Sequence, residues 1–360
     1  MKEEIIKRLD AFRAEMRKAG IAAVVIPQTD AHLGEYIASH WQVRRWLSGF
    51  TGSAGSLVVT LSEALLWTDS RYFIQAALQL DGTGIKLMKE GIPGTPTITQ
   101  WLVTNLVKGQ TVGIDGFLFS ATEADAMGAV LAKHDLKLDT HFAPIDKIWT
   151  DRPGLPADPV FLHDVKYAGR DAADKMKQVL TQTLEQGATS IIITDLTDVA
   201  WTLNIRSSDV SCTPVATSFL YLAETGGVLF INPAKIDDEV KAYLAANNVE
   251  VAPYESVVGY LENLPATATV LVEPSRVAAR LRDALGARAV SGASPVALLK
   301  AVKNSVQIQG IRRAMESDGA ALVGAFMEIE RRNATGESLT ELDVADILTE
   351  YRSKQPEYFE

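Results

Sequence analysis

The stretch that decides the fold is KRLDAFRAEMRKAGIAAVVIPQTD, residues 7–30. Apolar residues recur in it at helical spacing up to Gly20, and the apolar run IAAVVIP follows directly. Such a run is typical of a strand that is buried on both faces of a sheet. Gly20 suits the end of the helix, where a positive φ costs a glycine little. The stretch therefore predicts a helix over 3–19, a buried strand, and a second helix capped by Thr29 or Asp30.

The same order of elements returns in KMKQVLTQTLEQGATSIIITDLTD, residues 175–198. Gly187 and Ile193 each lie 167 positions after their counterparts Gly20 and Ile26. In both copies a helix, a glycine, an apolar strand and a Thr–Asp pair follow one another. We interpret the chain as two similar α/β domains that arose by duplication, although any two α/β units share these features.

Strands and helices alternate between the two copies, which is typical of α/β domains. Strands are expected at 56–60 and 64–69, with a helix from about Tyr72. The stretch WTDRPGLPADPVF, residues 149–161, contains three prolines and no periodic pattern, so it predicts a domain boundary. We expect one domain over residues 1–160 and a second over residues 161–305.

Residues 306–360 have a different character. A long amphipathic helix is predicted from Val306, and a second one follows in which Ser338 and Glu341 have the spacing of a capping box. Two amphipathic helices with no sheet after them have little to pack against. We therefore expect them to be the opening of a third domain whose remainder is absent.

Composition excludes several classes of protein. A net charge of −10 argues against nucleic acid as a partner, because an acidic surface repels phosphates. Cys212 is the only cysteine among the 360 residues, so a reducing compartment is expected. The charged N-terminus has no apolar core of a secretory signal, and the apolar runs are too short to span a bilayer. We expect a soluble, cytoplasmic protein without a membrane partner.

The glycine-rich segment GFTGSAG, residues 49–55, raises the question of phosphate binding. A P-loop requires a lysine that reaches the phosphates, and a dinucleotide fingerprint opens a helix. Here the glycines are spaced by three, no lysine is near, and a strand follows. We interpret the segment as a tight loop that leads the chain into that strand.

Motifs for metal or nucleophilic catalysis are missing. The five histidines include none after His163, and the sequence has neither HExxH nor a Cys/His cluster. His32 and Glu35 could share one face of a helix, but such a pair is more often a surface hydrogen bond than a ligand set. There is no GxSxG motif, and Cys212 has no recognisable base partner. No catalytic, cofactor-binding or metal-binding residue is therefore predicted.

Arg71 is the remaining candidate. It stands between Asp69 and the aromatic pair Tyr72–Phe73, where a strand is expected to pass into a helix. A guanidinium in this position can bind a carboxylate or a peptide carbonyl. The alternative is a structural ion pair with Asp69 or another acid, and the residues alone favour that alternative.

Several segments together resemble a known family. In order along the chain they are DAHLGEYIA, RRWLSGFTGSAGSLVVT, LLWTDSRYFIQAALQL, KIWTDRP and DVAWTLNIRSSDV. They are similar to segments of the three-domain cytosolic Xaa-Pro aminopeptidases (aminopeptidase P), in the creatinase/prolidase-like metallopeptidase family. The resemblance runs over essentially the whole chain. It implies two similar creatinase-type N-terminal domains, each a mixed sheet flanked by helices, followed by the first helices of a truncated "pita-bread" peptidase domain.

The resemblance also implies a reaction. Members of the family remove the N-terminal residue from peptides that have proline at position two, and they commonly act as homodimers. Their pita-bread domain binds two divalent metals, usually manganese, through two aspartates, a histidine and two glutamates, and a metal-bridged hydroxide attacks the peptide bond. In the family these ligands lie downstream of where this chain ends, so none is assigned here. We expect these 360 residues alone to bind no metal and to be inactive.

One functional residue transfers by resemblance. In the cytosolic three-domain members, the arginine of the matching W-T-D-x-R-Y-F motif contacts substrate, and its counterpart here is Arg71. Arg71 is therefore a predicted substrate-binding residue. An alternative of a different class is a catalytically dead module of the same superfamily that binds peptides or proteins. A small-molecule enzyme related to creatinase is a third reading, which the WTDSRYF and KIWTDRP matches disfavour.

Overall fold

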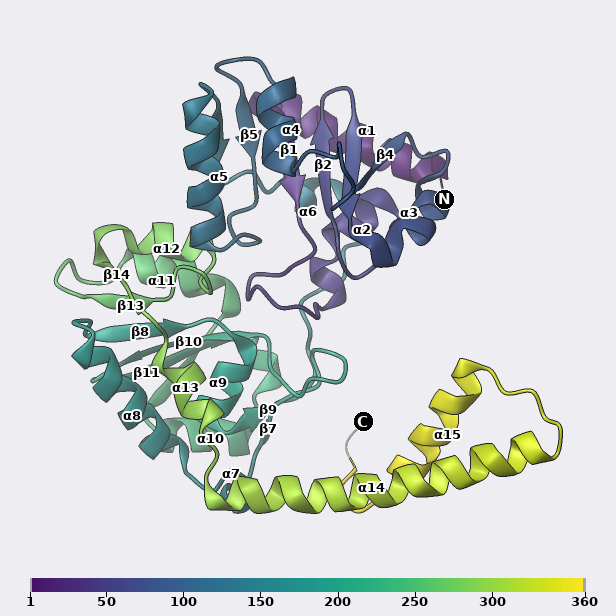
Figure 1. Ribbon diagram of the computed structural model, residues 1–360. Coiled ribbons are helices and arrows are strands. Elements are labelled where there is room, and N and C mark those ends of the chain that lie inside the picture. Colours follow the sequence, from purple (N-terminus) through teal and green to yellow (C-terminus); the bar gives the residue numbers. More distant parts are fainter. Residues whose placement is uncertain (1, 359–360) are drawn as a thin grey trace.

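The computed structural model describes residues 2–358 and contains two α/β domains followed by a helical arm (Figure 1). Domain I, from α1 to α6, contains a six-stranded sheet in the order β4-β3-β2-β1-β5-β6. Strands β1, β2 and β3 pair antiparallel, and the remaining pairs are parallel. The strands are β1 (Ile21–Ile26), β2 (Ser56–Thr60), β3 (Ala64–Thr68), β4 (Ile85–Lys89), β5 (Thr111–Gly113) and β6 (Lys137–Asp139).

Domain II, from β7 to α13, repeats this sheet. Its order is β12-β11-β10-β8-β13-β14, and the antiparallel and parallel pairs occur at the same places as in domain I. The mixed α/β fold with two similar domains is therefore confirmed. The strands are β8 (Ser190–Ile193), β10 (Ser218–Ala223), β11 (Gly226–Ile231), β12 (Val249–Ala252), β13 (Val270–Val272) and β14 (Ala289–Ser291), with the small pair β7 (Phe161–Leu162) and β9 (Ile205–Arg206).

Helices cover both faces of the sheet in domain I. The buried stripe of α1 (Lys2–Ala19) includes Leu9 and Phe12 and packs on one face. The helices α4 and α5 pack on the other face, and each begins with a capping box, at Thr97 and Ser120. The remaining helices are α2 (Val43–Ser48), α3 (Phe73–Leu80), α4 (Ile98–Asn105), α5 (Ala121–Lys133) and α6 (Ile145–Ile148).

Domain II is layered in the same way. Its helices form two apolar cores, one on each face of the sheet. These helices are α7 (Val165–Ala168), α8 (Ala172–Glu185), α9 (Leu196–Leu203), α10 (Asp238–Ala246), α11 (Val257–Glu262), α12 (Ala279–Leu285) and α13 (Pro295–Ala301).

The helical arm consists of α14 (Ser305–Ala334) and α15 (Glu341–Ser353). In Figure 1 the arm leaves the base of domain II, runs beneath domain I, and turns back on itself. The long helix is confirmed, but the predicted capping box at Ser338 is wrong: Thr340 caps α15 and Asp343 completes the box. None of the helices among residues 2–358 is both long and apolar enough to cross a bilayer.

The two domains are joined by backbone hydrogen bonds as well as by side chains. Ala121 N donates to Val277 O at 2.9 Å, Ala279 N donates to Phe119 O at 2.8 Å, and Arg280 N donates to a carbonyl of domain I at 3.0 Å. Backbone pairing of this kind fixes position and register at once. Domain I is therefore held at a defined orientation on domain II.

Candidate functional site

Arg71 lies on the surface of domain I, directly after β3. Asp69 caps the short 3-10 turn η2 (Ser70–Tyr72) by accepting from Arg71 N at 3.0 Å. The Arg71 side chain turns back to the same carboxylate, so that Nε lies 3.0 Å from Oδ1 and Nη2 lies 2.8 Å from Oδ2. This is the fork-to-fork geometry that an arginine offers and a lysine cannot. The hydrogen bond with Arg71 lowers the pKa of Asp69.

The ion pair leaves most of the guanidinium available. The Arg71 side chain is 67% exposed, and it uses only two of its five N–H donors on Asp69. Its guanidinium carbon lies 5.3 Å from the centroid of the Tyr72 ring, which limits where it can swing. Arg71 is therefore a positioned cation with free donors that point away from its own pair.

The glycine loop supports this arrangement from below. Tyr72 OH lies 2.6 Å from Ser53 Oγ in the loop. A Cβ on Gly52 would contact the Phe50 ring and would lie 2.7 Å from Tyr72 Cδ1, so only glycine fits at this place. The loop interpretation of GFTGSAG agrees with the structure: it packs against the end of β3 and carries the residues beside Arg71.

Arg44, which the sequence analysis did not single out, organises the loop. Its side chain is fully buried and donates to Phe50 O at 3.3 Å, to Gly52 O at 2.5 Å and to Gln28 Oε1 at 2.9 Å. Burial lowers its pKa to about 10, so it stays charged near neutral pH. In the sequence the pair Arg44–Arg45 reads as the exposed face of a helix, and no local pattern marks the first arginine as buried.

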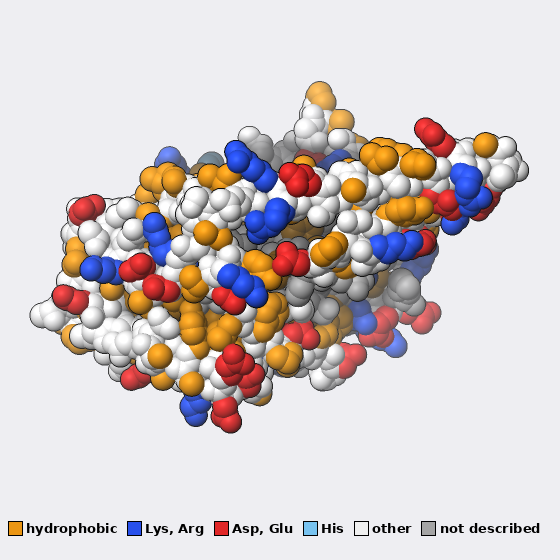
Figure 2. Space-filling view, turned by 90° about the horizontal axis from the view of Figure 1, so that it is seen from below, with side chains coloured by type: hydrophobic (Ala, Val, Ile, Leu, Met, Phe, Trp, Pro, Cys, Tyr) orange, Lys and Arg blue, Asp and Glu red, His pale blue; other side chains and the backbone are white. Residues whose placement is uncertain are grey.

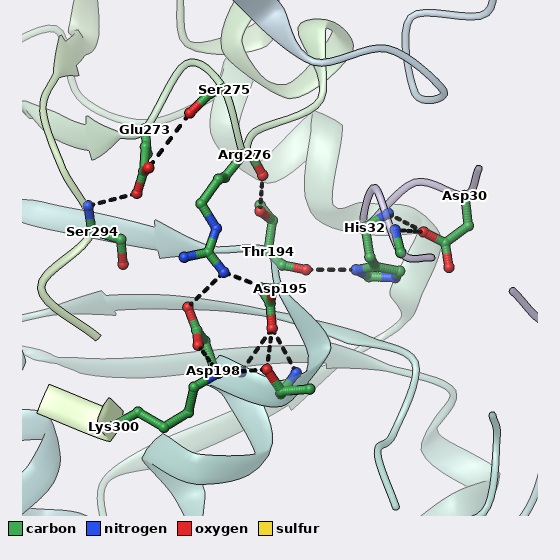
Figure 3. Close-up of polar contacts among 12 residues, drawn as sticks. Asp30, His32, Thr194, Asp195, Asp198, Glu273, Ser275, Arg276, Ser294 and Lys300 are labelled. Carbon is green, nitrogen blue, oxygen red and sulfur yellow. Dashed lines mark hydrogen bonds and ion pairs between the residues drawn. The ribbon is translucent and has the colours of Figure 1, made fainter. Parts of the chain in front are cut away.

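His32 connects the two domains (Figure 3). Its Nδ1 lies 2.8 Å from Thr194 O and its Nε2 lies 3.0 Å from Tyr254 OH, both in domain II. A carbonyl oxygen only accepts, so Nδ1 carries the proton and Nε2 accepts from the tyrosine. Burial lowers the pKa of His32 and keeps the ring neutral.

The predicted helix from Thr29 or Asp30, and with it a shared helix face for His32 and Glu35, is wrong. Residues 27–38 form turns, and Leu33 has a positive φ of 57°. Asp30 does act as a cap, but it accepts from His32 N and Gly34 N, both at 2.9 Å, within a non-helical turn. The turn places the His32 imidazole against domain II.

A second group of polar residues lies at the carboxyl end of β8 (Figure 3). Asp195 caps α9 and its Oδ2 lies 2.7 Å from Arg276 Nη2. Asp198 is buried and lies 2.6 Å from Lys300 Nζ and 3.5 Å from Arg276 Nη2. Glu273 Oε2 accepts from Ser294 N at 2.9 Å. Asp195 and Asp198 are paired with the two cations Arg276 and Lys300, and these ion pairs connect α9 with the segment before α12 and with α13.

These carboxylates do not fit a pair of divalent cations. Asp195 and Asp198 are already neutralised by Arg276 and Lys300, and a cation there would meet two like charges. Within residues 2–358, no three side chains of His, Cys, Asp or Glu are arranged to hold a metal ion.

Known proteins share this architecture. Creatinase/Prolidase N-terminal domains are recognised at residues 8–148 and again at residues 151–307. The chain belongs to the creatinase/prolidase family. It is 37% identical to aminopeptidase P2 of Arabidopsis thaliana over 93% of its length, and 34% identical to a probable Xaa-Pro aminopeptidase P of Sordaria macrospora over 98%.

A solved structure agrees in fold over the whole chain. It is the X-prolyl aminopeptidase of Caenorhabditis elegans, a cytosolic enzyme with a di-nuclear active site, and it matches with a TM-score of 0.92 at 33% identity over 100% of the chain. The chain covers 61% of that enzyme, and it covers 52% and 59% of the Arabidopsis and Sordaria proteins. It thus spans only between 52% and 61% of the length of these relatives.

Proposed function

We propose that this chain provides the two N-terminal domains of an Xaa-Pro aminopeptidase. The complete enzyme would remove the first residue from peptides with proline at position two, in the cytoplasm, as a homodimer, and with two divalent metals, for which manganese is our candidate. The observation that supports this most is the agreement in fold with the Caenorhabditis elegans enzyme over the entire chain. The donor set for two metals would belong to the part of the relatives that this chain does not match, so residues 1–360 alone would not hydrolyse peptides.

Within this function, we propose that Arg71 contacts the substrate. Its exposed fork has free N–H donors, and a peptide offers carbonyl and carboxylate oxygens that accept such bonds. In Figure 1, α2 and α3 lie on the side of domain I that faces the α14–α15 arm. Arg71 lies in the turn directly before α3, so a domain that packs against the arm would lie on the same side as Arg71.

The α14–α15 arm exposes apolar side chains that a further domain could cover. Along α14, Ala321 and Ala325 are buried, whereas several large apolar side chains are exposed. Figure 2 shows hydrophobic side chains gathered along the arm that projects to the right. Exposed apolar area of this kind marks a contact surface. We propose that residues 306–360 begin the peptidase domain. The exposed residues are Met315, Val323, Phe326 and Met327 on α14 and Leu342 on α15.

The test is made on a complete enzyme, in which this chain is joined to a peptidase domain. Arg71→Ala should lower kcat/KM for an Xaa-Pro tripeptide by about tenfold to a hundredfold, the effect of losing a charge-assisted hydrogen bond. Arg71→Lys should recover only part of this loss, because an ammonium cannot form the bidentate contact. Arg45→Ala, which removes an exposed arginine of the same domain, is the matched control and should leave kcat/KM unchanged.

The alternative roles give different results. If Arg71→Ala unfolds the protein while the folded fraction retains normal kcat/KM, the Arg71–Asp69 pair is structural and the substrate contact is wrong. If the enzyme with its remainder and added Mn²⁺ cleaves no Xaa-Pro peptide, the peptidase assignment itself fails. The catalytically dead module of the same superfamily is then the better description.

A further inference from the structure

A large cavity lies between the two domains, away from Arg71. It has a volume of about 820 Å³ and is lined by residues of both domains, among them Trp41 and Asp115 of domain I and Tyr254, Glu255 and Arg280 of domain II. Its size is that of a small-molecule site, and domain interfaces are where such sites are most often found.

The cavity is preformed because its walls are fixed. The backbone of Arg280 is tied to domain I by its hydrogen bond to Gly116 O at 3.0 Å. Trp41, Phe117 and Tyr254 belong to one apolar cluster that crosses the interface. Rigid aromatic walls of this kind bind an apolar body at low entropic cost.

Several polar groups on these walls have no partner among residues 2–358. Trp41 Nε1 is buried and has no hydrogen-bond acceptor there. The side chains of Arg280 and Glu255 make no hydrogen bond or ion pair with any described residue. Arg152 differs, because it donates to His40 O at 2.9 Å and to Asp146 Oδ1 at 2.5 Å. One cation and one anion at this cavity therefore make no direct side-chain pair with the described residues, and Asp115 adds a negative charge near Arg280.

We propose that this cavity binds a zwitterionic small molecule with an apolar body, of the class of free amino acids and short peptides. Arg280 pairs with the carboxylate, Glu255 pairs with the ammonium group, and the aromatic walls hold the apolar part. Polyanions such as nucleotides are disfavoured, because Asp115 and Asp146 also line the cavity.

The inference does not depend on the peptidase function, since Arg71 does not line the cavity. Its test is therefore made by isothermal titration calorimetry on the 360-residue chain. L-phenylalanine and the dipeptide L-alanyl-L-phenylalanine are the two probes, which separate amino acids from peptides. At least one of them should bind with a Kd of about 1 mM or lower. 3-Phenylpropionate and 2-phenylethylamine, which each lack one charge, should bind at least about tenfold more weakly.

Variants locate the site. Arg280→Gln and Glu255→Gln should each weaken binding of the better probe by about tenfold or more. Arg312→Gln, which removes an exposed charge on α14, is the matched control and should leave the affinity unchanged.

Circular dichroism and thermal unfolding check that each variant is folded. Should Arg280→Gln not fold, Glu255→Gln at the exposed rim still tests the site. The proposal is overturned if neither zwitterion binds at about 10 mM. It is equally overturned if folded Arg280→Gln or Glu255→Gln binds the probe as the wild-type protein does.

Discussion

Arg71 in domain I and Lys235 in domain II lie in short turns that follow corresponding strands, β3 and β11, of two sheets of the same topology. In each domain an Asp or Asn follows the second strand in the sheet order, β3 or β11, and caps a short 3-10 turn: Asp69 caps η2, and Asn232 caps η3 (Pro233–Lys235). Each turn carries one basic residue. Arg71 is 67% exposed and bonds to its own cap, whereas the Lys235 side chain is 0% exposed and pairs with Asp209.

The difference shows how one structural device serves two purposes. In domain II the cation is buried with its anion, and Asp209 Oδ2 also accepts from Thr217 N at 2.6 Å, so the pair holds the domain together. In domain I the cation stays in solvent, where a pair adds little to stability and the charge can reach another molecule. The turns that follow these two strands therefore place a basic residue in opposite environments, buried beside its anion in domain II and exposed to solvent in domain I.

The largest effect should come from breaking the buried pair. Lys235→Met fills a similar volume but leaves the Asp209 carboxylate buried without its cation, so the free energy of unfolding should fall by about 3–5 kcal/mol. Urea unfolding followed by circular dichroism measures this. Adding Asp209→Asn should restore part of the loss, because it removes the uncompensated charge. A loss below about 1 kcal/mol for Lys235→Met would contradict the structural role.

A smaller effect should follow from crowding the loop beneath Arg71. Gly52→Ala places a methyl group against Phe50 and Tyr72 and should cost about 1–3 kcal/mol of unfolding free energy. Gly154→Ala, where a methyl group meets nothing within 4 Å, should cost far less and serves as the control. Equal costs for the two variants in urea unfolding would show that the loop is not close-packed.

Domain II holds domain I through a neutral histidine, and this predicts a pH dependence. Burial lowers the pKa of His32 below its usual 6.5, so the unfolded chain takes up a proton that the folded chain does not. Stability should therefore fall as the pH drops below about 6.5, with His32 contributing at most about 1.4 kcal/mol per pH unit. His32→Phe should flatten this slope, whereas His134→Gln, at an exposed site, should not. An unchanged slope in His32→Phe would show that His32 does not cause the pH dependence of stability.

The smallest effect should come from the exposed pair. Arg71→Ala should shift the thermal midpoint of the 360-residue chain by no more than about 2 °C, because an exposed ion pair is screened by water. Differential scanning calorimetry of Arg71→Ala beside Lys235→Met tests the comparison directly. Similar shifts for the two variants would mean that both basic residues are structural.

Much of the fold could be predicted from local patterns. The stripe of α1, the apolar strand β1 and their repeat as α8 and β8 follow from periodicity, which neighbouring residues set among themselves. The same pattern misled at Thr29–Asp30. The matching pair Thr194–Asp195 does precede a helix, but Leu33 adopts a left-handed conformation that ends any helix at once. A Thr–Asp pair predicts a capping side chain, but it does not determine whether a helix or a short turn follows.

Only part of the candidate site could be predicted from local sequence patterns. Arg71 stood out because a strand and two aromatic residues surround it, and its substrate contact remains a prediction. Arg44, His32 and Lys235 carried no local signal, since what decides them lies far along the chain. His32, for example, finds Tyr254 across 222 positions.

The sequence by itself determined the two α/β repeats, the long helix and the arginine between a strand and a helix, because each depends on residues within about one helical turn or one strand of one another. Only the tertiary structure decided which basic residues are buried, which histidine joins the domains and where a cavity forms between them. The burial of a side chain and its hydrogen-bond or ion-pair partners depend on contacts between residues far apart in the sequence. These contacts form only when the sheets and helices pack together.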